Sequence, residues 1–110
     1  MKATITSLEL RGPFHFFALS KQAMYIVKQL KTTNCKEFKK KGIWTKHYTM
    51  TLWNSEEELR AFAESGAHKE AMGKSAKIAK EIRTITLDVD ELPNWSVAKE
   101  LLKEGKVYRF

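Results

Sequence analysis

A chain of 110 residues is long enough for one domain around one hydrophobic core and too short for two. Its 43% hydrophobic content and interspersed charges, with 20 Lys and Arg against 13 Asp and Glu, exclude a disordered protein. No apolar run approaches the roughly 18–20 residues of a membrane-spanning helix, and the single cysteine, Cys35, excludes an intrachain disulfide.

The first third of the chain predicts a strand, a helix and a second strand. Residues 3–10 alternate, but their apolar residues change phase, which predicts a bulge or an early end. Gly12-Pro13 ends this strand. Near-helical spacing up to Leu30 predicts a helix that begins at about Ser20, or as early as Phe14.

A lysine run follows a short predicted strand over residues 35–38. Lys39-Lys40-Lys41-Gly42 is typical of a hairpin turn. We interpret these lysines as protection of an edge strand against aggregation, in preference to a binding patch. The remaining lysines, at mostly outward helical positions, are interpreted as a solvated surface.

Residues 46–53 form the clearest predicted strand. Tyr48, Met50 and Leu52 alternate with a second set that consists of His47, Thr49, Thr51 and Trp53. We expect the apolar set to pack on helices. The second set then faces the other side of the sheet, where a partner or a pocket can lie.

Two helical stretches and two strands complete the chain. Ser55 and Glu58 have the spacing of a capping box, and Gly66 is the expected end of the helix that they start. His68 then lies on the inward stripe of a second helical stretch. A strand over residues 82–89, a helix capped by Asn94 and ended by Gly105, and a strand over 107–110 follow.

The element order β-α-β-β-α-β with a C-terminal helix predicts an α+β, ferredoxin-like split βαβ domain over residues 1–110. In this arrangement the helices cover one face of an antiparallel sheet. Because the other face is then uncovered, we expect a homodimer in which two sheets close a barrel around a cavity.

One block of the sequence resembles the dimeric α+β barrel superfamily of antibiotic-biosynthesis-monooxygenase-like proteins. Within it, the pattern is most similar to the branch of spheroidene monooxygenase and many short, uncharacterised proteins. The resemblance spans residues 44–82 and rests on Tyr48-Thr-Met-Thr-Leu-Trp53, Ser55, Phe62, Ser65-Gly66-Ala67-His68 and Ala71-Met72. It implies an oxygenase that acts on an aromatic or isoprenoid molecule, with haem or with no cofactor.

The resemblance also implies site residues. Met72 aligns with the iron-ligating histidine of haem-degrading members and Phe62 with their aromatic partner, so the match to that activity is incomplete. His68 aligns with a histidine beside the cavity, and it is the expected base or haem ligand; its alternative role is a hydrogen bond that fixes a helix break. The expected pocket lining is Trp53, Trp44, Thr49, Thr51, Phe62 and Met72. His47 is expected at the surface, and no metal site is expected.

These observations favour a small homodimeric monooxygenase-like protein with an apolar pocket. A non-catalytic protein that binds a small hydrophobic or aromatic ligand is the alternative. RNA binding is a distant third, because the sheet offers threonines where RNA-binding sheets carry paired aromatic residues. We expect a cytoplasmic protein with no nucleic-acid or membrane partner, since no apolar signal core follows Met1-Lys2.

Overall fold

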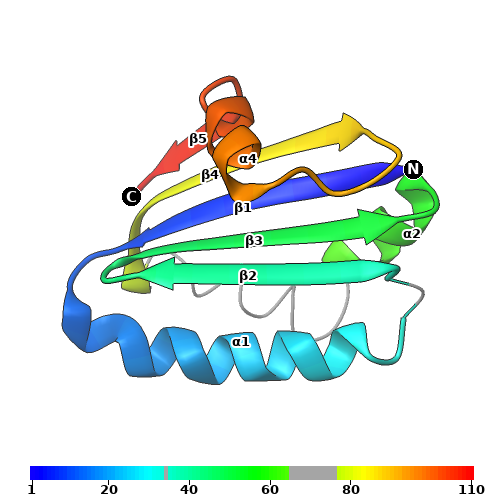
Figure 1. The fold of residues 1–110 in the computed structure, drawn as a ribbon. Coiled ribbons are helices and arrows are strands. Elements are labelled where there is room, and N and C mark those ends of the chain that lie inside the picture. The colour runs from blue at the N-terminus through cyan, green and yellow to red at the C-terminus, as the bar shows by residue number, and fades with distance from the viewer. Residues whose placement is uncertain (34, 65–76) are drawn as a thin grey trace.

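A computed structural model describes residues 1–33, 35–64 and 77–110. The described strands are β1 (Lys2–Leu10), β2 (Glu37–Ile43), β3 (Lys46–Trp53), β4 (Ala79–Asp88) and β5 (Lys106–Arg109). They form one sheet in the order β2-β3-β1-β4-β5, and every neighbouring pair is antiparallel. The predicted α+β, ferredoxin-like fold is therefore confirmed (Figure 1).

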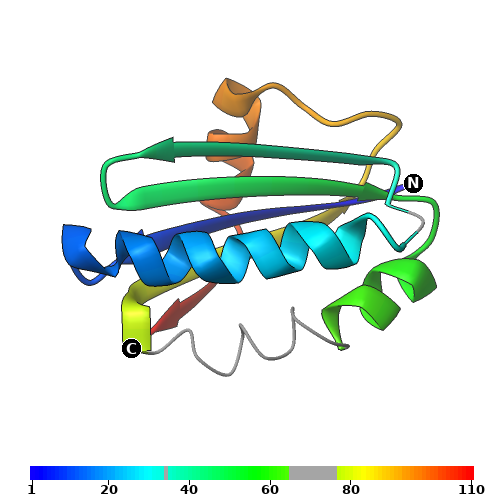
Figure 2. The same cartoon turned by 90° about the horizontal axis from the view of Figure 1, so that it is seen from below.

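Helices lie on both faces of this sheet. The 3-10 turn η1 (Pro13–His15) leads into α1 (Phe16–Leu30), and α1 lies on the same face as α2 (Glu56–Ala63). The C-terminal helix α4 (Trp95–Leu102) lies on the opposite face (Figures 1 and 2). The expectation that the helices share one face therefore holds for α1 and α2 and is wrong for α4.

The main core fills the space between α4 and the sheet. Ala98 and Leu102 of α4 pack among fully or almost fully buried side chains of the strands, which are Ala3, Ile5, Tyr48, Met50 and Leu52. Asn94 starts α4, since its Oδ1 accepts a hydrogen bond of 2.9 Å from the Val97 amide. The apolar set of β3 thus packs on a helix as expected, but on α4, so this face is not left uncovered.

Strand boundaries differ from the expected ones at β2. The lysines at 39–41 belong to the strand itself, and the turn to β3 falls at Trp44 and Thr45. β2 is an edge strand of the sheet, which agrees with the interpretation of its lysines as edge protection. The sequence pattern misplaced the turn because a Lys-Lys-Lys-Gly run has weak strand propensity, which pairing with β3 overrides.

Other boundaries agree within a few residues. The predicted bulge in the first strand is present as a register shift between Glu9 and Leu10. α1 begins at Phe16, between the two expected starts, and Ser55 caps α2 by accepting a hydrogen bond of 3.3 Å from the Glu58 amide. The predicted helix end at Gly66 lies outside the described residues. Of the described helices, none combines the length and apolar character that crossing a bilayer requires.

Candidate ligand pocket

A cavity of about 490 Å³ lies between the sheet and the two helices α1 and α2. Threonines occupy the middle of the sheet side, which also includes apolar residues such as Leu8 and Ile82, and most of the helix side is apolar. Six threonines of the three central strands line the sheet side: Thr4, Thr6, Thr49, Thr51, Thr84 and Thr86. A cavity of this size and mixed lining suits a small organic molecule.

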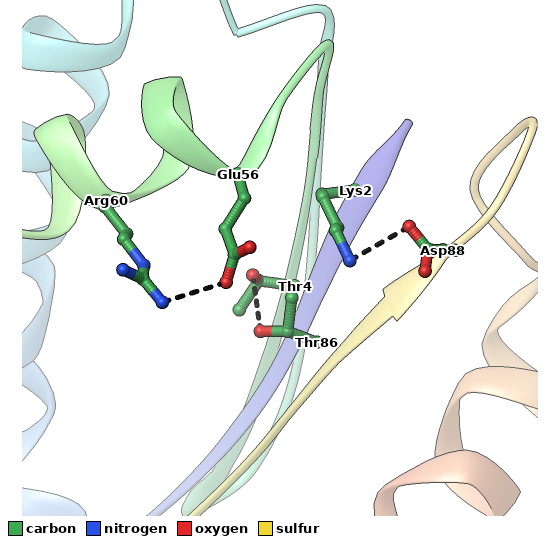
Figure 3. Close-up of polar contacts among 6 residues, drawn as sticks. All are labelled: Lys2, Thr4, Glu56, Arg60, Thr86 and Asp88. Carbon is green, nitrogen blue, oxygen red and sulfur yellow. Dashed lines mark hydrogen bonds and ion pairs between the residues drawn. The ribbon is translucent and has the colours of Figure 1, made fainter.

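The strand register arranges these threonines in two rows of three, here called the threonine floor. Thr51, Thr4 and Thr86 lie side by side in one row, and Thr49, Thr6 and Thr84 lie in the next. The Oγ1 atoms of Thr4 and Thr86 are 3.1 Å apart, and those of Thr6 and Thr84 are 3.2 Å apart (Figure 3 shows the first pair). Each hydroxyl both donates and accepts, so the floor offers polar contacts without a fixed charge.

Apolar side chains of α1 and α2 form the opposite wall. They come from successive inward positions of the helices, which are Leu19, Ala23, Ile26, Val27 and Leu30 of α1 and Leu59, Phe62 and Ala63 of α2. This spacing of three and four residues places them on one face of each helix. A ligand in the cavity would therefore have threonine hydroxyls on one side and hydrocarbon on the other.

His47 lines the cavity at the start of β3. Its Nε2 atom is buried and has no hydrogen-bond partner among the described residues, and its ring lies 5.8 Å from the Phe16 ring, centroid to centroid. Burial lowers the pKa of His47, and a hydrogen bond to the Trp44 backbone opposes this effect in part. The imidazole is thus neutral near pH 7, with a buried nitrogen free to accept a proton.

The other end of the cavity carries charged groups near the start of α2. Arg60 Nη2 lies 3.1 Å from Glu56 Oε1, and both residues line the cavity (Figure 3). Nearby, Lys2 Nζ lies 2.9 Å from Asp88 Oδ1. The hydrogen bond to Asp88 raises the pKa of Lys2, to which the Glu56 charge adds a smaller contribution, and the Lys2 ammonium lowers the pKa of Asp88.

The structure brings together only part of the expected lining. Thr49, Thr51 and Phe62 line the cavity. Trp53 is fully buried behind it, with its ring 5.2 Å from the Phe62 ring, and its Nε1 atom has no hydrogen-bond partner among residues 1–33, 35–64 and 77–110. Trp44 does not line it, because this residue lies in the β2–β3 turn with a φ of 54° and is 79% exposed. His68 and Met72 lie outside the described residues.

His47 is the pocket residue that sequence reasoning placed elsewhere. Neighbouring lysines suggested an exposed histidine, yet His47 shares the strand phase of Thr49 and Thr51. Strand alternation puts residues 47, 49 and 51 on one face, so any cavity bordered by the two threonines also receives the histidine. That phase was the signal available in the sequence.

Haem or no cofactor was the expectation, and the described residues fit haem poorly. His47 Nε2 is suited to ligate an iron. The guanidinium that lines the cavity, that of Arg60, is however already paired with Glu56 and is a poor partner for two propionates. A metal ion held by side chains alone is a separate case: among the described residues no group of three or more His, Cys, Asp and Glu side chains is placed to hold one.

Solved structures with the same fold are known, although the sequences are distant. One is a protein from Deinococcus radiodurans that is provisionally named an antibiotic biosynthesis monooxygenase; it has a TM-score of 0.74 and 10% identity over 86% of this chain and 97% of that chain. Rv0793 from Mycobacterium tuberculosis has a TM-score of 0.74 and 13% identity over 84% and 98% of the two chains. A further protein with the same provisional name, from Nitrosomonas europaea, has a TM-score of 0.72 and 11% identity over 83% and 100%.

No protein-family model matches the sequence, and no curated protein matches it significantly. The solved structures nevertheless confirm, at the level of the fold, the expected likeness to antibiotic-biosynthesis-monooxygenase-like proteins. A shared fold alone does not define a reaction, because one fold hosts many functions.

Proposed function

We propose that this protein is a monooxygenase-like enzyme that binds a small aromatic molecule with a hydroxyl group in the cavity over the threonine floor. The proposal rests on His47, which lines that cavity and whose buried Nε2 has no hydrogen-bond partner in the part of the chain that the structure describes. Leaving such an acceptor unsatisfied costs about 1–3 kcal/mol, which a bound hydroxyl would recover. The fold, shared with proteins provisionally named monooxygenases, supports the same reading.

The chemistry assigned to His47 is proton acceptance. A phenolic hydroxyl that donates to Nε2 passes its proton to the imidazole as dioxygen takes electron density from the ring, because a phenolate is a better electron donor to dioxygen than a phenol. In the balanced reaction, one oxygen atom replaces a ring hydrogen and gives a quinone, and the second oxygen leaves as water. The substrate itself supplies the electrons, so the described residues need only bind it, orient it and hold its proton.

Oxygen uptake with a set of small hydroxyarenes tests the activity. We expect consumption of one dioxygen per quinone formed, and at least a tenfold lower rate in His47→Gln, which keeps a polar side chain but no basic nitrogen near pH 7. His15→Gln is the matched control, because His15 lies in η1 and does not line the cavity. Full activity of His47→Gln would remove His47 from the reaction.

A protein that binds the same ligand without turnover is the second candidate. The threonine floor and the apolar wall support binding alone as well as they support catalysis, since both contact a ligand without reacting with it. Ligand binding by wild type with no oxygen uptake from any hydroxyarene would select this function. Freshly purified protein should also be checked for a Soret band, which would bring haem back into consideration.

Two sequence expectations remain part of the proposal. His68 stays a predicted base or haem ligand, and His68→Gln belongs in the same activity series.

The homodimer also stays a prediction, although α4 covers the sheet face that was expected to be bare. The four-residue edge strand β5 with its exposed Tyr108, and the exposed Phe110 just after it, offer a remaining surface for a second copy. Sedimentation at micromolar concentration measures this directly.

A further inference from the structure

The outward face of α1 exposes large apolar side chains. Phe14 just before the helix is 91% exposed and Phe17 is 79% exposed, and one to two turns later Met24 is 58% and Tyr25 52% exposed. Helical spacing puts these residues on the side opposite Leu19, Ile26 and Leu30, which face the cavity. This side faces the viewer in Figure 2. Such a concentration of exposed aromatic and apolar residues is typical of an interaction surface.

The same face is basic. Lys21 and Lys28 lie between the apolar residues on the outward side and are exposed. No Asp or Glu occurs in the sequence from Leu10 to Lys36, so α1 and its flanks carry positive charge only. The chain as a whole has a net charge of +7. An amphipathic face that combines Phe, Tyr and Met with Lys matches helices that lie in the interface of an anionic bilayer.

A second copy of this chain is a poor occupant for the face. In a two-fold contact each copy presents the same patch, so Lys21 and Lys28 would meet the lysines of the partner with no carboxylate from α1 to pair them. An anionic lipid surface instead offers phosphates to the lysines and an acyl boundary to the aromatic rings.

We propose that the outward face of α1, with Phe14, Phe17, Lys21, Met24, Tyr25 and Lys28, docks this protein on anionic lipid membranes. This inference does not depend on the function proposed for the cavity. It departs from the sequence expectation of no membrane partner, and it needs no spanning segment, because the helix lies along the surface.

Vesicle flotation with the full chain tests the proposal. Wild type should bind vesicles of equimolar phosphatidylglycerol and phosphatidylcholine, bind pure phosphatidylcholine at least tenfold more weakly, and dissociate as salt rises from about 0.1 M to about 1 M. Phe14→Gln/Phe17→Gln and Lys21→Gln/Lys28→Gln should each weaken binding on the order of tenfold or more. These side chains are exposed, and circular dichroism shows whether each variant is folded.

Two control variants test where binding occurs. Lys40→Gln/Lys41→Gln removes the same charge from β2, and Val97→Gln removes an exposed apolar side chain from α4 on the other face. We expect both to change vesicle binding less than about threefold. The proposal is overturned if wild type does not bind anionic vesicles, or if the β2 variant loses as much binding as the α1 lysine variant. It is equally overturned if Phe14→Gln/Phe17→Gln converts a wild-type dimer into a monomer, because the face is then an interface between copies.

Discussion

Gly42 lies directly opposite His47 in the antiparallel pair of β2 and β3, and it leaves room for the imidazole ring. A Cβ atom on residue 42 would stand 2.6 Å from His47 Nδ1 and 2.9 Å from Cε1. An alanine there would force the ring to move. The position of the candidate base therefore depends on the absence of a side chain on the neighbouring strand.

The first prediction follows from this contact. Gly42→Ala should lower hydroxyarene turnover severalfold or more, because the displaced imidazole no longer presents Nε2 at the same point in the cavity. Oxygen uptake measures the effect. Gly12→Ala is the matched control, since no atom of the described residues, other than its chain neighbours, lies within 4 Å of a Cβ at residue 12, and its extended φ of −176° suits alanine. Equal losses in the two variants would show that the Gly42–His47 contact is not the cause.

The second prediction concerns Gly105, which ends the α4 segment. A Cβ there would lie 2.6 Å from the Thr84 carbonyl oxygen and 3.1 Å from that of Leu102. Both are backbone atoms, so no side chain can rotate away, and we expect Gly105→Ala to destabilise the fold by about 1–3 kcal/mol. Chemical denaturation gives the value. A denaturation midpoint equal to that of Gly12→Ala would mean that the backbone near Thr84 can shift with little loss of stability.

The third prediction is a pH dependence of stability. Burial depresses the pKa of His47 in the folded protein below its unfolded value, which is near 6.5. The unfolded chain then binds the proton more readily, so the contribution of neutral His47 to stability is present above about pH 6.5 and is lost as the pH falls toward the folded pKa. Thermal melts from pH 8 to pH 5 should show a smaller decrease for His47→Gln than for wild type. An imidazole titration by NMR with a midpoint above 6.5 would contradict the sign.

The fourth prediction concerns the turn between β2 and β3. Trp44 has a positive φ of 54°, which costs a residue with a Cβ about 1–2 kcal/mol, whereas glycine adopts it freely. Glycine also makes the unfolded chain more flexible, so Trp44→Gly should stabilise the protein by no more than about 1 kcal/mol. Ligand affinity in the cavity should not change, because Trp44 does not line it. A denaturation curve and a binding isotherm on this variant check both statements.

The order of the elements could be predicted from the sequence because the alternation in β3 and the caps at Ser55 and Asn94 are local signals. The side of the sheet that each helix covers could not. Both α4, with Ala98 and Leu102, and α1 have an apolar stripe that can pack on a sheet. No local pattern says which helix covers the face of Tyr48 and which covers the face of Thr49. That choice is made by packing between elements distant in the chain.

The sequence allowed the threonines of the candidate site to be predicted more readily than its histidine, His47. Thr49 and Thr51 followed from strand alternation once a pocket was assumed. His47 shares their strand phase, but the lysines near it in the sequence favoured solvent, and it is the packing of α1 near the start of β3 that buries its ring. Its contact with Phe16 joins residues 31 positions apart and leaves no trace in a local pattern.

The threonine floor has a consequence for selectivity. Hydroxyl groups rotate and can donate or accept, so they place few demands on where along the two rows a ligand puts its polar atoms. Discrimination then falls to the two ends of the cavity, a neutral acceptor at His47 and the Glu56–Arg60 pair beyond the last row. Such a cavity selects ligands by length. A molecule long enough to contact both ends binds in one pose, whereas a shorter molecule can bind at several positions along the rows.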